Sequence, residues 1–181
     1  MTDGDADHPD SDMPGPAGPD LATRVLVLAP TARDAEVTRS LLLSAGLAVG
    51  VCADARRLAA EVAAGAGAAL VTEEAVGADG IDDLLAVLGS QPPWSDFPIV
   101  LLMRGGAQSV AAARVLQALQ NVTVLERPAP MRSVVSSVQA AVRSRRRQYL
   151  MRDQLDQIRR DRKAHGTHFP VRRRPMGTIH P

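Results

Sequence analysis

The chain alternates short apolar runs with helical patterns five times over, and this alternation constrains the fold more than any other feature. Each run has the length of a strand and is bounded by residues that cap helices or turn the chain. Repeated strand–helix units with short connections predict a parallel sheet covered by helices on both faces. We therefore predict an α/β fold: a doubly wound five-stranded parallel sheet of flavodoxin-like order 2-1-3-4-5, with an extended C-terminal helix. The predicted strands are Val25–Ala29, Leu47–Cys52, Ala68–Thr72, Phe97–Met103 and Asn121–Arg127.

Capping residues and glycines set the predicted helices. Thr31 is expected to cap the first helix, with Asp34 three residues later, and Gly46 to end it. Asp54 is expected to cap a second helix that runs through Ala64 to Gly65. Three more helices are predicted from the apolar spacing, over Asp79–Leu88, over Ser109–Leu119 and from Met131 onward.

Composition limits the class of protein. Apolar residues make up 45% of the chain and aromatic residues only 2%, so the core must be aliphatic. Cys52 is the single cysteine, which excludes an internal disulfide framework and a metal site built from cysteines. No apolar run approaches the roughly 20 residues that span a bilayer, and the N-terminus lacks the pattern of a secretion signal. We therefore expect a cytoplasmic protein.

Charge divides the chain into unlike halves. Residues 1–130 carry 8 arginines against 17 acidic residues, whereas residues 131–181 carry 13 basic residues against 3 aspartates. The predicted organisation is a disordered acidic leader over 1–22, a domain over 23–147, an extension of the last helix over 148–163, and a disordered basic tail over 164–181.

Charged side chains gather where the predicted strands end. In a parallel sheet these ends share one crevice, so the residues there are candidates for a site. A guanidinium suits a carboxylate in such a place because its planar fork binds both oxygens and stays charged. We expect a Glu73–Arg127 pair, and the alternative is a set of unrelated solvated charges that contribute about 0–1 kcal/mol each. The candidate residues are Arg33, Glu73, Glu74, Met103, Arg104, Arg127 and Pro128.

The fifth strand ends in Arg127–Pro128, which resembles the Lys–Pro that ends the last strand of bacterial receiver domains, the CheY-like domains of response regulators. The five strand–helix units from Arg24 to Arg147 fit that family as well. The resemblance implies a phosphoryl-accepting Asp after the third strand, an acidic pair after the first strand that holds Mg²⁺, a Thr or Ser after the fourth and a Lys after the fifth.

The sequence departs from the receiver pattern at each of these positions. Ala29–Pro30–Thr31 follows the first strand in place of an acidic pair, and Thr72–Glu73–Glu74 ends the third strand without an Asp. Met103 falls at the hydroxyl position and Arg127 replaces the Lys. Phosphoryl transfer needs a cation and a lysine to offset the charge that gathers on the phosphoryl oxygens. The resemblance therefore implies a receiver fold without the receiver's chemistry.

These observations predict a non-phosphorylatable pseudo-receiver that acts as a protein-interaction module in bacterial two-component signalling. It resembles the N-terminal receiver-like segment of some histidine kinases, and it is either a free-standing adaptor or a truncated relative of such a kinase. We expect no enzymatic activity, no metal and no cofactor. The expected partners are a histidine kinase, a regulator, or a second copy of the chain. The second copy would bind through a weak heptad stripe on the last helix, formed by Met151, Leu155 and Ile158.

Parts of the sequence also fit two other functions. The Arg-rich C-terminus could bind nucleic acid through phosphates. No helix-turn-helix or zinc finger follows the receiver-like part, however, and no aromatic stacking platform accompanies the basic cluster, so we do not expect this partner. The second alternative is a phosphorylatable receiver with Glu73 or Asp34 as the acceptor. The absence of an acidic pair in the sequence argues against it.

Overall fold

The computed structural model describes residues 21–76, 80–104, 113, 116–117 and 121–165. The strands are β1 (Val25–Leu28), β2 (Val49–Cys52), β3 (Ala68–Thr72), β4 (Ile99–Arg104) and β5 (Val122–Arg127). The helices are η1 (Leu21–Thr23, a 3-10 turn), α1 (Ala32–Ser44), α2 (Ala55–Ala64), α3 (Glu73–Val76), α4 (Ile81–Gly89) and α6 (Met131–His165).

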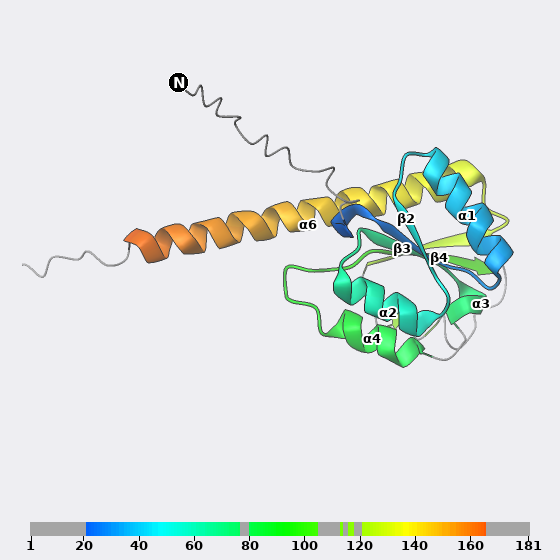
Figure 1. Ribbon diagram of the computed structural model, residues 1–181, viewed down its shortest axis with the longest axis horizontal. Helices are drawn as coiled ribbons and strands as arrows, with labels where there is room; N and C mark the ends of the chain where they lie inside the picture. The colour runs from blue at the N-terminus through cyan, green and yellow to red at the C-terminus, as the bar shows by residue number, and fades with distance from the viewer. Residues whose placement is uncertain (1–20, 77–79, 105–112, 114–115, 118–120, 166–181) are drawn as a thin grey trace, which may run out of the picture.

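The five strands form one parallel sheet in the order β2-β1-β3-β4-β5, which confirms the predicted fold class. Figure 1 shows α2 and α4 together on one face of this sheet, and α1 and the first half of α6 on the other. The carboxyl ends of the strands therefore open along a single edge, between the two helical layers.

Alternation along the strands divides the core into two layers. In β1, Leu26 and Leu28 pack toward α2 and α4, whereas Val25 and Val27 pack toward α1 and α6. All four side chains are at most 2% exposed. A strand buried on both faces in this way is typical of a doubly wound sheet, and it explains why the strands read as continuous apolar runs.

The predicted caps are present. The Asp34 backbone N–H donates to Thr31 Oγ1 at 3.1 Å, and the Arg57 N–H donates to Asp54 Oδ1 at 2.6 Å. Gly46, just past the end of α1, has a φ of +78°, a left-handed conformation that glycine adopts without a steric penalty. These local signals fix where α1 and α2 begin and end.

The observed boundaries differ from the predictions at several places. β2 begins at Val49 instead of Leu47, β4 at Ile99 instead of Phe97, and α3 was not predicted at all. The helix predicted over Ser109–Leu119 lies largely outside the described residues. So do the predicted leader and tail, except that residues 21–22 belong to η1 and residues 164–165 to α6, where disorder had been expected.

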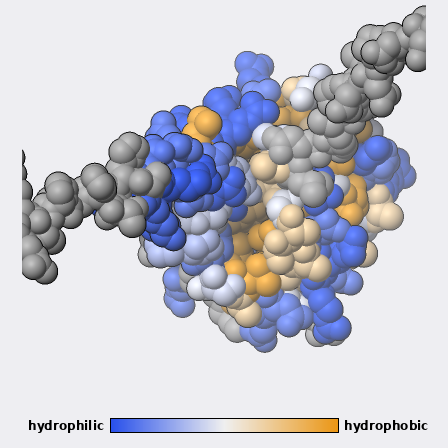
Figure 2. Space-filling model, turned by 60° about the vertical axis from the view of Figure 1, so that its left-hand side comes forward, coloured by the Kyte–Doolittle hydropathy of each residue, from blue (hydrophilic) through white to orange (hydrophobic). Residues whose placement is uncertain are grey.

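The last helix, α6, continues without a break from the domain into the predicted extension. Val134, Val138 and Val142 pack against the sheet and are 8%, 0% and 5% exposed. Figure 1 shows the second half of α6 projecting beyond the domain. In Figure 2 this projecting end, beside the grey trace at the left, is mostly hydrophilic. Among the described helices, none combines the length and apolar character needed to cross a membrane.

Candidate functional site

The carboxyl ends of β3, β4 and β5 bring four charged residues together. α3 begins directly after β3, so its first two residues, Glu73 and Glu74, stand at the strand ends. Arg104 ends β4 and Arg127 ends β5, and the two lie opposite each other in the register of these strands. Like charges placed opposite each other are destabilising unless an anion lies between them.

Glu74 supplies that anion. Its Oε1 accepts a hydrogen bond from Arg104 Nε at 2.7 Å and a second from Arg127 Nη2. The Glu74 side chain is 22% exposed, that of Arg127 33% and that of Arg104 70%. One carboxylate oxygen therefore bridges both arginines, and Arg127 is the better shielded of the two partners.

The pairing corrects the predicted one, because Arg127 pairs with Glu74 and not with Glu73. Glu73 is 6% exposed, and its Oε2 accepts the backbone N–H of Arg104 at 3.0 Å. Both glutamates lie in the first turn of a helix, where successive side chains differ in direction by about 100°. Glu73 consequently turns inward to fasten the end of β4, and Glu74 turns toward the two guanidinium groups.

The pKa of Glu74 is lowered from its ordinary value of 4.5. Burial is the largest single influence and raises the pKa, but the hydrogen bond from Arg127, the backbone N–H of Glu74 and the charges of Arg127 and Arg104 together outweigh it. A lowered folded-state pKa means that the pair stabilises the fold fully above the ordinary pKa. This contribution is lost as the pH falls through the lowered value.

The other predicted crevice residues have different environments. Met103 is 5% exposed and packs in the core toward α2 and α4, so it does not line the crevice as expected. The cause is alternation: Arg104, the next residue, points the other way along β4. Arg33 is exposed in the first turn of α1, and no hydrogen bond or ion pair joins it to the described acidic residues.

Pro128 follows Arg127 through a cis peptide bond and borders a groove of about 530 Å³. Arg104 and Arg127 form the polar part of its lining, and Leu102, Ala129 and Val134 form the apolar part. Within the described ranges, no group of three or more His, Cys, Asp or Glu side chains could hold a metal ion. Asp34, weighed as an acceptor, receives a hydrogen bond from Thr31 Oγ1 at 2.7 Å and serves as part of the helix cap.

The crevice pair can be tested with a double-mutant cycle of Glu74→Gln and Arg127→Gln, read by denaturant unfolding at pH 7. The coupling is expected to be about 1–2 kcal/mol, between the values for exposed and buried pairs, because both side chains are partly shielded. The coupling should begin to shrink near pH 4.5, where Glu74 of the unfolded chain becomes protonated, and should be lost as the pH falls through the lowered pKa of the folded state.

The matched control is the Glu74–Arg104 cycle. Its arginine is 70% exposed, so the expected coupling is at most about 0.5 kcal/mol. Equal coupling in the two cycles would contradict the assignment of Arg127 as the main partner.

Solved structures share this architecture, although no family model matches the chain and no curated protein matches it in sequence. A CheY-like response regulator receiver domain from Methanospirillum hungatei JF-1 is 16% identical, with a TM-score of 0.56 over 69% of this chain and 97% of that one. A putative response regulator from Chloroflexus aurantiacus J-10-fl is 21% identical, with a TM-score of 0.53 over 66% and 97%. The receiver domain of a histidine kinase from Syntrophus aciditrophicus is 17% identical, with a TM-score of 0.55 over 68% and 92%.

The fold is that of a receiver domain. At sequence identities of 16% to 21%, the similarity to these structures concerns the fold alone. Glu74, Arg104 and Arg127 lie in the crevice at the carboxyl ends of the strands. The resemblance to receiver domains implies that the phosphorylation site of that family lies at this same edge of the sheet.

A second cluster lies at the opposite edge of the receiver fold, around Arg145 of α6. Its guanidinium carbon lies 4.6 Å from the ring centre of Tyr149, 5.5 Å from that of Trp94 and 5.6 Å from that of Phe97. The side chain is only 6% exposed. Three of the four aromatic residues of the chain therefore surround one buried cation.

Hydrogen bonds tie the same cluster to the loop before β4. Arg145 Nη1 donates to Ser95 Oγ at 2.6 Å and to Gln148 Oε1 at 2.8 Å. Gln148 also clasps the backbone of Asp96: its Oε1 accepts the Asp96 N–H at 3.0 Å and its Nε2 donates to the Asp96 carbonyl at 2.8 Å. The cluster fastens α6 to the start of β4.

Sequence reasoning missed Arg145, although a signal was present. The buried positions Val134, Val138 and Val142 continue at the same helical spacing to residues 145 and 149. An arginine on the inward stripe of a helix needs acceptors or aromatic rings to receive it. Trp94, the only tryptophan of the chain, supplies one of those rings.

Proposed function

We propose that this chain is a regulatory receiver-like module that accepts no phosphoryl group and acts through contacts with other proteins in two-component signalling. The observation that carries the proposal is the Glu74 carboxylate, which is held between Arg104 and Arg127 at the crevice. In this arrangement, glutamate and arginine supply a permanent charge balance where receivers use a phosphorylated aspartate and a lysine.

Glu73 supports the same conclusion. A phosphoryl acceptor needs an accessible carboxylate oxygen, and Glu73 is 6% exposed with one oxygen receiving the Arg104 N–H. The residues after β1, Ala29–Pro30–Thr31, also bring no carboxylate to the crevice. The neighbouring structures include receivers of response regulators and of a kinase, which makes two-component signalling the context that we propose.

Incubation with acetyl phosphate and Mg²⁺ is expected to leave the mass of the intact protein unchanged. Arg127→Lys, which installs the family's lysine, should give the same result because it adds no carboxylate ligand and frees no acceptor. Intact-protein mass spectrometry before and after hydroxylamine treatment measures this directly. A phosphate adduct that hydroxylamine removes would overturn the proposal, and a phosphorylatable receiver treated in parallel controls for the reagent.

We further propose that the projecting part of α6 binds a partner helix, with a second copy of the chain as one such partner. Met151, Leu155 and Ile158 are 59%, 44% and 53% exposed, and they recur at a spacing of four and three on this helix. Leu155 also borders two shallow grooves beside Trp94. These apolar side chains on an otherwise charged helix are typical of a contact surface.

Leu155→Asp is expected to reduce self-association without changing the fold, because it places a charge at the centre of this apolar stripe. The measurement is light scattering over a range of concentrations, with circular dichroism to check the fold. Gln154→Asp adds the same charge beside the stripe and is the matched control, expected to have little effect. Unchanged mass for the Leu155 variant at every concentration would count against a second copy as the partner.

The alternative function, nucleic-acid binding, draws on the charge of α6, which carries ten basic residues against three aspartates. Such a helix can attract phosphates without sequence preference. Binding to a DNA probe that falls steeply with salt and ignores sequence would indicate charge attraction alone, whereas tight sequence-specific binding would favour this alternative.

A further inference from the structure

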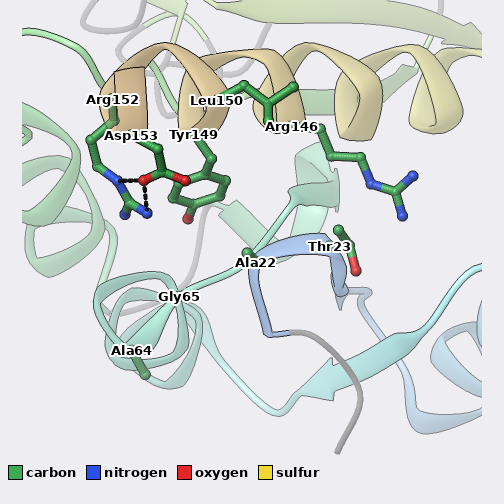
Figure 3. A pocket seen from close by; sticks show the side chains of 9 residues that line it. All are labelled: Ala22, Thr23, Ala64, Gly65, Arg146, Tyr149, Leu150, Arg152 and Asp153. Atoms are coloured by element: carbon green, nitrogen blue, oxygen red, sulfur yellow. Dashed lines mark hydrogen bonds and ion pairs between the residues drawn. The ribbon is translucent and has the colours of Figure 1, made fainter. Parts of the chain in front are cut away.

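The point where the N-terminal leader joins the domain lies beside α6. η1 packs against this helix, and the two enclose a pocket of about 630 Å³ together with the end of α2. The walls are Ala22 and Thr23 of η1, Ala64 and Gly65 at the end of α2, and one side of α6 from Arg146 to Asp153. Figure 3 shows the Arg146 side chain extending from α6 on the side of the pocket where Thr23 lies.

This part of α6 carries positive charge without local compensation. Arg143, Arg146 and Arg147 are exposed and make no ion pair within the part of the chain that the structure describes. Further along the helix, Arg152 pairs with Asp153 and Arg159 with Asp156. Arg160, Arg162 and Lys163 are exposed there and make no ion pair with a described residue, but they lie more than a dozen residues beyond Arg143, on the part of α6 away from the pocket. Arg143, Arg146 and Arg147 lie within five consecutive positions, so their charges add at one place on the surface.

The leader has the complementary charge. Residues 1–20 contain six aspartates and no lysine or arginine, and the last of these aspartates, Asp20, directly precedes η1. The leader is therefore tethered beside the pocket wall that contains Arg146.

We propose that the acidic leader of this chain docks on the basic surface of α6 formed by Arg143, Arg146 and Arg147, and shields it from other polyanions. Leu21 follows Asp12 by nine residue steps, a stretch that can span up to roughly 30 Å. The leader can therefore reach all three arginines. A short tether of this kind gives an effective concentration on the order of millimolar, which favours the leader over dilute competitors.

The proposal does not depend on phosphoryl chemistry in the crevice, which lies at the other edge of the sheet. It also gives the charge asymmetry of the chain a role, because the acidic and basic ends become partners. Nucleic acid and the acidic surface of a second copy are the competing occupants. The experiment below distinguishes them from the leader.

The test places a nitroxide spin label in the leader of the full chain through Ser11→Cys. Cys52 does not take up the label, because it is 3% exposed and burial together with the nearby Glu61 charge raises the pKa of its thiol to about 11. Docking is expected to broaden the amide NMR signals of residues 143–150. The effect should disappear between about 50 mM and about 500 mM salt, as the Debye length falls from roughly 14 Å to roughly 4 Å.

Two triple variants of the labelled protein form a matched pair. Arg143→Gln, Arg146→Gln and Arg147→Gln together should abolish the broadening, whereas Arg159→Gln, Arg160→Gln and Arg162→Gln remove the same charge further along α6 and should preserve it. No broadening at low salt, or equal loss in both variants, would overturn the proposal. Broadening seen only when labelled chains are mixed with isotope-labelled, spin-free chains would assign the surface to a second copy and also overturn it.

A second measurement tests the shielding. Asp→Asn at positions 3, 5, 7, 10 and 12 should increase the affinity for a short DNA probe about tenfold at low salt, since several exposed ion pairs are lost at once. A leader with the same composition in shuffled order is the control and should leave the affinity unchanged. If neutralising the leader has no effect on DNA binding, the leader does not shield α6.

Discussion

Arg145→Ala is expected to lower the free energy of unfolding by about 3 kcal/mol. The variant loses a desolvated cation that contacts three aromatic rings and donates two hydrogen bonds, to Ser95 and Gln148. Desolvated cation–π contacts are worth about 2 kcal/mol or more, and hydrogen bonds to a charged group about 1.5–3 kcal/mol each. Release of the buried charge into water offsets part of this loss.

Arg152→Ala is the matched control. Arg152 lies over the same Trp94 and Tyr149 rings, at 5.3 and 5.0 Å, but it is 39% exposed and bonded to its neighbour Asp153. Its removal should cost no more than about 1 kcal/mol. Urea unfolding followed by circular dichroism measures both variants. Equal losses would mean that the buried cation contributes no more than a surface charge, contrary to the role assigned to Arg145.

Gly67→Ala is expected to cost about 2–3 kcal/mol, because a Cβ at this position would enter the backbone of Thr23. The new atom would lie 2.8 Å from the Thr23 carbonyl carbon and 2.9 Å from its Cα. The Gly67 N–H also donates to the Arg24 carbonyl at 2.7 Å, which holds the two segments together. Backbone atoms cannot rotate away as a side chain can, so β3 or η1 must shift.

Gly89→Ala provides the comparison for Gly67. A Cβ on Gly89, the last residue of α4, meets nothing within 4 Å. Alanine favours the helical conformation over glycine by up to about 1 kcal/mol, so this variant should be neutral or more stable. Thermal unfolding of both variants tests the contrast. A Gly67 variant as stable as the Gly89 variant would show that the approach of Gly67 to Thr23 is not tight.

The sheet could be predicted from the sequence because its strands are buried on both faces. Residues such as Leu26, Leu70 and Val100 leave no polar alternation, and a run of this kind between capping residues has few other interpretations. Strand ends were harder to predict. Leu47 and Phe97 are apolar and pack against the core, but they do so from the loops that lead into β2 and β4. Apolar burial alone therefore does not mark the first hydrogen-bonded residue of a strand.

The sequence predicted which charged residues lie close together at the candidate site, but not which glutamate pairs with Arg127. Sequence spacing placed Glu73, Glu74, Arg104 and Arg127 at one edge, because each lies at the end of a strand or directly after it. The choice between the two glutamates depended on α3, a single turn that the sequence did not indicate. Arg145 was not predicted for a related reason: several of its partners, among them Ser95 and Trp94, lie about 50 residues earlier, and only the tertiary structure brings them to the helix.

α6 is held against the domain along most of its length and projects beyond it at its C-terminal end. It begins three residues after Pro128 at the crevice and is held by Arg145 and Gln148 at the opposite edge. It then borders the Pro92–Trp94 loop as far as Arg159, and residues 160–165 extend beyond this loop by roughly 8 Å. A force applied to this free end is transmitted first to the contacts that Arg145 and Gln148 make with Ser95 and Asp96, and so to the loop that leads into β4. Any partner that grips the free end therefore pulls on the Arg145 cluster before it can disturb the ion pairs of the crevice.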